Sequence, residues 1–274
     1  MPRVRLGAVG YLNARPLVYG LDASAEFDLR YDVPSKCAEL LHEGAIDVGL
    51  IPSIEYNHPI TRTEYAIVPE LAIASNGPVA SVAIYSRRPM HEVRSIALDT
   101  SSRTSIALVR VLCQREFKIA PRLEHRGPDL TEMLATSDAA LIIGDNALVR
   151  DGGDGIEKTD LGEVWKRMTG LPFVYAFWAG RHGSLTAHDV DALQRARDRG
   201  LRHIDDIARD YFASVPDQQG VGARYLRDNI KYSLGAEERA GLELFYQYAV
   251  EAGAITRAEP LRFFEAGLKA RTTS

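Results

Sequence analysis

Cysteine and paired histidine are scarce in this sequence. The two cysteines, Cys37 and Cys113, lie far apart among apolar residues, so there is no disulfide framework and no Cys-x-x-Cys motif. The seven histidines are scattered, without the His-x-His or His-Glu-x-x-His spacing of metal sites. We expect two buried thiols in a reducing compartment. No motif proposes a metal site, which leaves open only one assembled from distant residues.

Nucleotide-binding and hydrolase motifs are also absent. The chain has no Gly-x-x-x-x-Gly-Lys-[Ser/Thr] phosphate loop, and the glycines at 7 and 10 lack the third glycine of a dinucleotide site. Gly-x-Ser-x-Gly, the nucleophile turn of many serine hydrolases, does not occur either. These absences disfavour most cofactor-dependent and hydrolytic enzymes.

Long apolar runs and an excess of basic residues are missing as well. No segment approaches the roughly 18 apolar residues of a membrane span. Lys and Arg number 33 against 37 Asp and Glu, a net charge of −4 that disfavours a nucleic-acid partner. Residues 1–7 lack the apolar stretch of a signal peptide, so we expect a cytoplasmic protein.

What the sequence does contain is a regular alternation of strand-like and helical patterns, typical of an α/β sheet. Strands are predicted at 4–9, 27–33 and 46–51, with helices at 14–20 and 34–43. A second series has strands at 95–98, 123–125 and 139–143, with helices at 104–117 and 130–135. Residues 151–159 read as a loop, and helices are expected after the Thr186–Asp189 capping pattern, at 236–252 and at 258–270.

Two further apolar runs, 79–85 and 171–179, flank the second series and are expected to link two lobes. The sequence therefore predicts an α/β protein in which one unit is inserted into another. Lobe I would comprise residues 1–86 and 174–274, including the C-terminal helices, and lobe II residues 87–173. A cleft between two such lobes is a preferred small-molecule site that closes by a hinge.

Polar residues gather where predicted strands end, which is where open α/β sheets bind ligands. Asn13 follows the first strand, and the sequence alone favours it as a helix N-cap. Ser81 follows an Asn-Gly-Pro turn and, taken alone, is structural. Asp145 ends an apolar strand, where capping the next helix and facing the cleft are equally favoured.

The segment after the strand at 95–98 is the richest in hydroxyl groups. It reads Thr100, Ser101, Ser102, Arg103, Thr104 and Ser105, at the start of a predicted helix. Five hydroxyls exceed what one cap needs, and a helix N-terminus attracts anions, so we expect an anion site. Arg103 is expected to pair with a ligand carboxylate or with a nearby acid such as Asp145.

Six motifs occur in order over about residues 4–180. They are Tyr-Leu-Asn-x-x-Pro-Leu at 11–17, Gly-Pro-Val-x-Ser at 77–81, Thr-Ser-Ser-Arg-Thr-Ser at 100–105, Ile-Gly-Asp at 143–145, Asp-Leu-Gly-Glu-x-Trp-Lys at 160–166 and Thr-Gly-Leu-Pro-Phe-Val at 169–174. Together they resemble the chorismate dehydratase family of the futalosine route to menaquinone. The helical C-terminal third adds little to the resemblance.

The resemblance implies a two-lobed fold like type II periplasmic binding proteins, and a cytoplasmic lyase that needs neither metal nor organic cofactor. The family converts chorismate to 3-[(1-carboxyvinyl)oxy]benzoate and water. Asn13 and Ser81 would hold the enolpyruvyl carboxylate, so that the substrate's own carboxylate takes the C3 proton. Tyr11, residues 100–105 and Asp145 would bind the rest of the substrate, and Asp145 as general acid or base is the competing hypothesis.

Two other functions stay open. One is the sister enzyme of the same pathway, which forms a dihydroxynaphthoate and lacks the Tyr-Leu-Asn-x-x-Pro motif. The other is a cytoplasmic binding protein or sensor for an aromatic or dicarboxylate ligand. Neither a nucleic-acid nor a membrane partner is expected, and the sequence leaves monomer and homodimer open.

Overall fold

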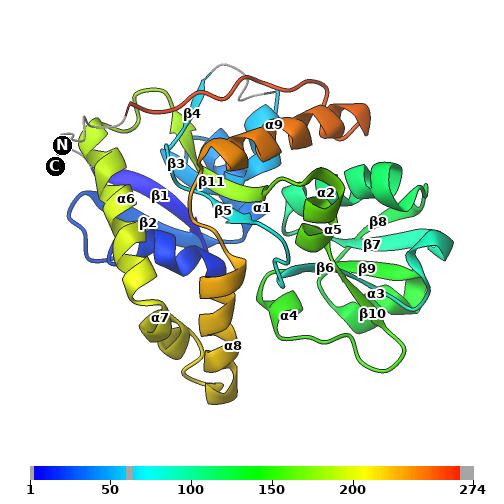
Figure 1. The fold of residues 1–274 in the computed structure, drawn as a ribbon. Helices are drawn as coiled ribbons and strands as arrows, with labels where there is room; N and C mark the ends of the chain where they lie inside the picture. The colour runs from blue at the N-terminus through cyan, green and yellow to red at the C-terminus, as the bar shows by residue number, and fades with distance from the viewer. Residues whose placement is uncertain (1–2, 60–63, 266–274) are drawn as a thin grey trace.

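Two β-sheets organise the chain in the computed structural model, which describes residues 3–59 and 64–265 (Figure 1). The first sheet runs in the order β2-β1-β3-β11-β4, with β5 also paired to β11. Its strands are β1 (Val4–Val9), β2 (Phe27–Asp32), β3 (Val48–Pro52), β4 (Tyr65–Ile67), β5 (Ile73–Ser75) and β11 (Phe173–Arg181). β1 pairs in parallel with β2 and β3, whereas β11 runs antiparallel to its neighbours.

The second sheet runs in the order β10-β6-β9-β7-β8. Its strands are β6 (Val82–Ser86), β7 (Ser95–Asp99), β8 (Arg122–Arg126), β9 (Ala139–Ile143) and β10 (Glu157–Asp160). The parallel neighbours of β7 confirm the predicted β-α-β series, and β6 enters the sheet antiparallel to β9.

Helices flank both sheets (Figure 1). They are α1 (Pro34–His42), α2 (Arg103–Leu112), α3 (Leu130–Thr136), α4 (Asp145–Leu148), α5 (Leu161–Thr169), α6 (Ala187–Arg202), α7 (Ile204–Tyr211), α8 (Gln219–Arg224) and α9 (Ala236–Glu251). Short 3₁₀ helices occupy Leu12–Val18, Ser53–Asn57, Met90–Glu92 and Pro216–Gln218, and π turns occupy Cys113–Phe117 and Tyr225–Asn229. The capping box of Thr186 and Asp189 starts α6 as predicted.

The structure corrects three of the predicted boundaries. β6 pairs with the second sheet, although a lobe boundary at residue 86 assigned it to lobe I. An apolar run shows burial but not which sheet buries it. β10 begins at Glu157, inside the predicted loop 151–159. Residues 258–265 are not helical, since Phe263 instead forms a parallel bridge to Ile67, and residues 266–270 lie outside the described part.

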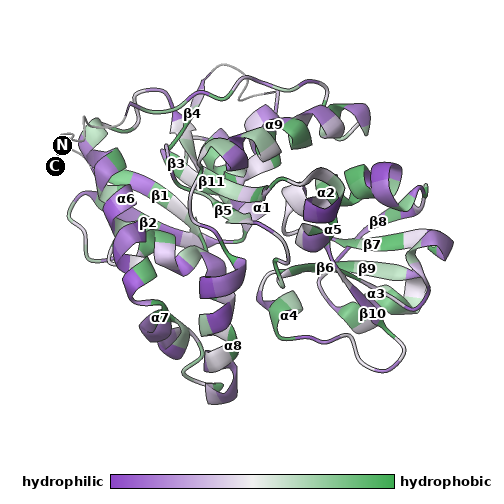
Figure 2. Cartoon of the chain, in the orientation of Figure 1, coloured by the Kyte–Doolittle hydropathy of each residue, from purple (hydrophilic) through white to green (hydrophobic). Residues whose placement is uncertain are grey.

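A continuous apolar core joins the first sheet to the inner face of the second, and a smaller core lies on the second sheet's other face beneath α3. The strands are mostly green and white in Figure 2, while α6 and α7 turn purple faces outward. Both cysteines belong to the main core, as predicted. Burial raises the pKa of the Cys37 and Cys113 thiols to about 12, so both stay protonated near neutral pH.

Candidate active site

A small cavity lies between the two sheets, and we call it the central cavity. It measures about 40 Å³, room for a few water molecules. The residues that line it are Val9, Tyr11, Asn13, Pro34, Pro52, Ile73, Val79, Ser81, Val82, Ser102, Ser105, Ile143, Gly144, Tyr175 and Ala176. Of the residues that the structure describes, none with a charged side chain lines this cavity.

Asn13 and Ser81 both line the central cavity, although they belong to different sheets' elements. Asn13 lies in the 3₁₀ helix that follows β1, and Ser81 immediately precedes β6. The Ser81 hydroxyl is buried and accepts a hydrogen bond from the Tyr225 hydroxyl at 2.7 Å. Asn13 makes no side-chain cap to its helix, so the cap that the sequence alone favoured is not formed.

The backbone ahead of Ser81 is held by one carboxylate, Asp160. Its oxygens accept hydrogen bonds from the amides of Val79 and Ala80, at 3.1 and 2.6 Å. The same side chain caps α5 through the amides at 162 and 163. Ala80 has a φ of 63°, a left-handed conformation that costs energy for a residue with a side chain. The two hydrogen bonds to Val79 and Ala80 hold this turn, and the two to α5 hold Asp160 itself, so the position of Ser81 just before β6 is fixed.

The hydroxyl-rich segment divides between the central cavity and other partners. Ser102 and Ser105 line the cavity, with 3.1 Å between their hydroxyl oxygens, and Ser102 also caps α2. The buried Thr104 hydroxyl accepts a hydrogen bond from the amide of Ile54 on the first lobe. A cap for α2 and an inter-lobe contact therefore account for part of the hydroxyl excess.

The other two hydroxyls of this segment do not line the central cavity. Ser101 donates from its hydroxyl to Asp99 at 2.6 Å, and its side chain hydrogen-bonds the phenol of Tyr11. Thr100 is exposed. Tyr11 lines the cavity and is half-buried, and this burial raises the pKa of its phenol.

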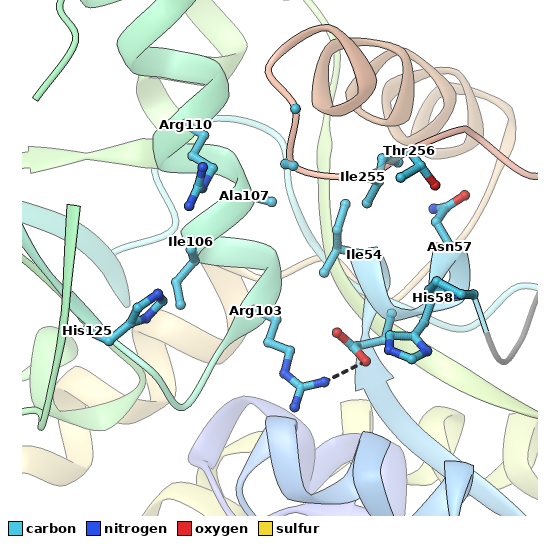
Figure 3. A pocket seen from close by; sticks show the side chains of 14 residues that line it. Ile54, Asn57, His58, Arg103, Ile106, Ala107, Arg110, His125, Ile255 and Thr256 are labelled. Carbon is cyan, nitrogen blue, oxygen red and sulfur yellow. Dashed lines mark hydrogen bonds and ion pairs between the residues drawn. The ribbon is translucent and has the colours of Figure 1, made fainter. Parts of the chain in front are cut away.

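Arg103 does not line the central cavity. It pairs with nearby acids, as one of the two predictions had it, but these are Glu55 at 2.9 Å and Glu39 at 3.3 Å and not Asp145, so it ties α2 to the first lobe. Burial opposes ionisation of Glu55, but its contacts with His42 and Arg103 hold its pKa below the usual value. Figure 3 shows this pair at the wall of a second pocket of about 460 Å³, beside α2 and Ile255.

Asp145 starts α4 and connects the two lobes. One carboxylate oxygen accepts from the amide of Leu12 at 3.2 Å, and the other accepts from the Tyr211 hydroxyl. Burial raises the pKa of Asp145, while these two donors act in the opposite direction. Asp145 does not appear among the cavity-lining residues, but the preceding Gly144 does. Gly144 has a φ of 67°, and a Cβ there would lie 3.0 Å from the Tyr11 ring.

Several residues around the cavity were missed in the sequence. Tyr175 lines the cavity, and Tyr225 and Tyr211 support Ser81 and Asp145 from the helical C-terminal third. The Tyr232 hydroxyl donates to the backbone carbonyl of Asn13 at 2.9 Å. No motif marked these tyrosines, because their partners lie between 66 and 219 residues away in the chain.

Within residues 3–59 and 64–265, no three His, Cys, Asp or Glu side chains come together as a metal ion would require. No helix in that part of the chain is long and apolar enough to cross a membrane.

Comparison with known proteins shows which family the chain belongs to. Residues 4–251 match a family model described as menaquinone biosynthesis. The chain belongs to the menaquinone biosynthesis family. It is 30% identical over 260 residues to the chorismate dehydratase of Thermus thermophilus, which covers 88% of this chain and 93% of that protein. It is 34% identical over 166 residues to the chorismate dehydratase of Campylobacter jejuni, covering 61% and 58% respectively.

Solved structures confirm the fold predicted for this menaquinone biosynthesis family member. A protein of Archaeoglobus fulgidus superposes with a TM-score of 0.75 at 16% identity, covering 92% of this chain and 98% of that one. The periplasmic aliphatic sulphonate binding protein of Escherichia coli gives a TM-score of 0.64 at 13% identity, covering 100% and 98%. The chain therefore has a periplasmic-binding-protein-like α/β fold.

Proposed function

We propose that this chain is a chorismate dehydratase, a carbon–oxygen lyase that converts chorismate to 3-[(1-carboxyvinyl)oxy]benzoate and water. The observation that carries the proposal is the central cavity, which brings Asn13 and Ser81 together between the lobes. The similarity to the chorismate dehydratase of Thermus thermophilus over 88% of the chain supports the same reaction.

The chemistry needed is an elimination. The C3–H bond breaks, its electrons form the last ring double bond, and the C4–O bond breaks as the hydroxyl leaves. The departing oxygen takes up a proton, so the products are one water and an aromatic ring. Aromatisation supplies a large driving force, which leaves the protein to orient the substrate and guide the proton.

The lining of the central cavity supports a substrate-derived base. Asn13 and Ser81 do not act as bases at neutral pH, and no carboxylate lines the cavity among the residues described. Asp145, the competing candidate, has its oxygens occupied by Leu12 and Tyr211. We therefore assign removal of the C3 proton to the enolpyruvyl carboxylate of the substrate itself.

The ring carboxylate fits the opposite wall of the central cavity. Ser102 and Ser105 offer hydroxyl groups at the N-terminus of α2, where the helix dipole favours an anion. The Ser102 and Ser105 hydroxyls hydrogen-bond each other, which uses one of their two hydrogens and leaves the other available to a ligand.

The direct test is incubation of the purified protein with chorismate, followed by chromatography and mass spectrometry. We expect a product one water lighter than chorismate, with the absorbance of a substituted benzoate. Binding of chorismate without conversion would instead support a sensor. Failure both to bind and to convert chorismate would contradict the proposal and direct attention to the sister naphthoate synthase.

A further inference from the structure

The Tyr225 hydroxyl lies behind the central cavity, in contact with both Ser81 and Asn13. It donates to the Ser81 oxygen at 2.7 Å, and both side chains are almost wholly buried. Burial raises the pKa of Tyr225, and the hydrogen-bond contact with Asn13, in which the Tyr225 oxygen accepts, acts in the opposite direction. One neutral phenol therefore joins the two polar residues.

A phenol has a single hydrogen, and this fact decides the direction of the other hydrogen bonds. Tyr225 donates its hydrogen to the Ser81 oxygen, so the Ser81 hydroxyl must donate its own hydrogen to a different acceptor. Because Ser81 lines the central cavity, that hydrogen is available to a ligand there. Ser81 is thus set as a donor, which suits an anionic oxygen.

The same reasoning orients the Asn13 amide. Because Tyr225 donates its only hydrogen to Ser81, its oxygen can act toward Asn13 only as an acceptor. The –NH₂ group of Asn13, which is a donor, therefore faces the Tyr225 oxygen. The Asn13 carbonyl oxygen then points away from Tyr225. It is buried and has no hydrogen-bond partner among residues 3–59 and 64–265. A buried acceptor without a partner costs free energy until a donor fills the space beside it.

We propose that Tyr225 is a positioning residue that fixes the hydrogen-bond polarity of the central cavity, with Ser81 as the donor and Asn13 as the acceptor. Given the proposed function, on which this assignment of ligand groups rests, Ser81 donates to the enolpyruvyl carboxylate and Asn13 accepts from the C4 hydroxyl. This assignment refines the sequence-based hypothesis that both residues hold the carboxylate. A carbonyl oxygen facing a carboxylate would repel it.

The arrangement suits the elimination. A hydroxyl that donates to Asn13 keeps its lone pairs free, so it can take up a proton as the C4–O bond breaks. The C4 hydroxyl and the enolpyruvyl group sit on neighbouring ring carbons, which matches two protein groups that share one phenol. Substrate discrimination follows, because a ring without a hydroxyl at this position leaves the Asn13 oxygen without a partner.

The test compares Tyr225→Phe with Tyr232→Phe. Both changes remove one buried hydroxyl beside Asn13, but the Tyr232 hydroxyl binds the backbone carbonyl of Asn13 and not its side-chain amide. We expect Tyr225→Phe to lower kcat/KM for chorismate about 10- to 100-fold, because Asn13 and Ser81 can then rotate. Tyr232→Phe should show a similar fall in melting temperature with a clearly smaller loss of kcat/KM, because it leaves the Asn13 side chain and Ser81 with their Tyr225 contacts.

A binding measurement separates an effect of Tyr225 on the hydrogen-bond polarity of the central cavity from a general loss of protein stability. Titration calorimetry with 4-hydroxybenzoate and benzoate compares rings with and without a hydroxyl para to the carboxylate, as in chorismate. We expect the wild type and Tyr232→Phe to favour 4-hydroxybenzoate by about tenfold, the free energy of one buried hydrogen bond. Tyr225→Phe should lose most of that preference.

Two results would overturn the inference: an unchanged preference in Tyr225→Phe, or an equal loss of preference in Tyr232→Phe. The calorimetry needs no turnover, so its outcome is independent of the proposed reaction. If wild type fails to convert chorismate, the proposed function fails. If wild type converts chorismate and Tyr225→Phe does so equally well, only the role of Tyr225 fails.

Discussion

A hydroxyl group outside the motifs and a carboxyl group from a distant motif hold the turn and the side chain of Ser81 in place. Tyr225 supports Ser81, and Asp160 holds the turn that precedes it. The motif at 77–81 carries a residue that lines the central cavity, but the groups that orient it come from elsewhere in the chain. Sequence inspection therefore singled out Asn13 and Ser81, gave Asp160 no role beyond its motif, and missed Tyr225.

Arg103 shows why residue type and position were not enough. Its place at a helix N-terminus among hydroxyls suggested a ligand contact. The structure instead offers it two carboxylates, Glu55 and Glu39, which follow other strands of the first lobe. A cationic side chain pairs with the acid that the fold brings nearest to it. Local sequence patterns do not show which acid that is.

At Asp145 the direction of the pKa shift gives a prediction for stability. Its pKa is raised above the ordinary value of 3.8, so folding favours the protonated form. The favourable contribution is complete below pH 3.8 and is lost as the pH rises through the folded-state pKa. The side chain in Asp145→Asn cannot ionise. The free energy of unfolding of this variant, relative to that of the wild type, should therefore increase as pH rises from about 4 to 7.

Urea denaturation of both proteins across that pH range measures the difference. If the wild type instead becomes more stable relative to Asp145→Asn as pH rises, the burial argument is contradicted. Turnover of the same variant addresses the competing chemistry, because a severe loss of kcat in a folded Asp145→Asn would restore Asp145 as the acid or base.

Elements are positioned by close backbone contacts that the chain makes at small residues. In α6, Gly200 lies against the 3₁₀ helix that carries Asn13, and a Cβ there would lie 2.3 Å from the Pro16 carbonyl oxygen. In α8, a Cβ at Gly220 would meet nothing nearer than the Arg224 side chain at 3.9 Å. The two helical glycines thus form a matched pair.

Gly200→Ala should destabilise the protein by about 1–3 kcal/mol through overlap with Pro16. Gly220→Ala should stabilise it by about 0.5–1 kcal/mol, because alanine is the better helix former. Thermal or chemical denaturation of the two variants measures both changes. Equal effects would show that α6 does not depend on this close approach.

Strand and helix positions were predictable because each depends on local periodicity and on short-range signals. Val4–Val9 and Ala139–Ile143 form as predicted, and α1 begins at Pro34. Sheet membership was less accessible, as β6 shows, because its pairing with β9 is decided by residues 53 to 61 positions away. The helix expected from residue 258 fails where a bridge to Ile67 competes.

For the whole molecule, the size of the central cavity implies motion. A space of about 40 Å³ holds a few waters and is too small for a ring with two carboxylates, so the lobes must separate to admit one. Inter-lobe contacts at Arg103 and Asp145 would break on opening. The structure thus represents a state more closed than the one that holds a ligand.

Small-angle X-ray scattering measures this opening. We expect the ligand-free protein to have a larger radius of gyration than the closed structure, and a saturating aromatic acid to reduce it. Arg103→Gln should shift the ligand-free protein further toward the open form, because it removes the cation that binds Glu55 and Glu39. Identical scattering with and without ligand, matching the closed structure, would contradict hinge opening.

The central claim is that chorismate is dehydrated in the cavity formed around Asn13 and Ser81. Steady-state turnover of chorismate by the wild type, Asn13→Ala, Ser81→Ala and Ser86→Ala tests it most directly. Ser86 is a matched control, because it is equally buried on β6 and its hydroxyl binds the carbonyl of Arg88. We predict wild-type turnover in Ser86→Ala and a fall in kcat of about 100-fold or more in the two cavity variants, with the fold intact. Near-normal turnover in Asn13→Ala and Ser81→Ala would contradict the account.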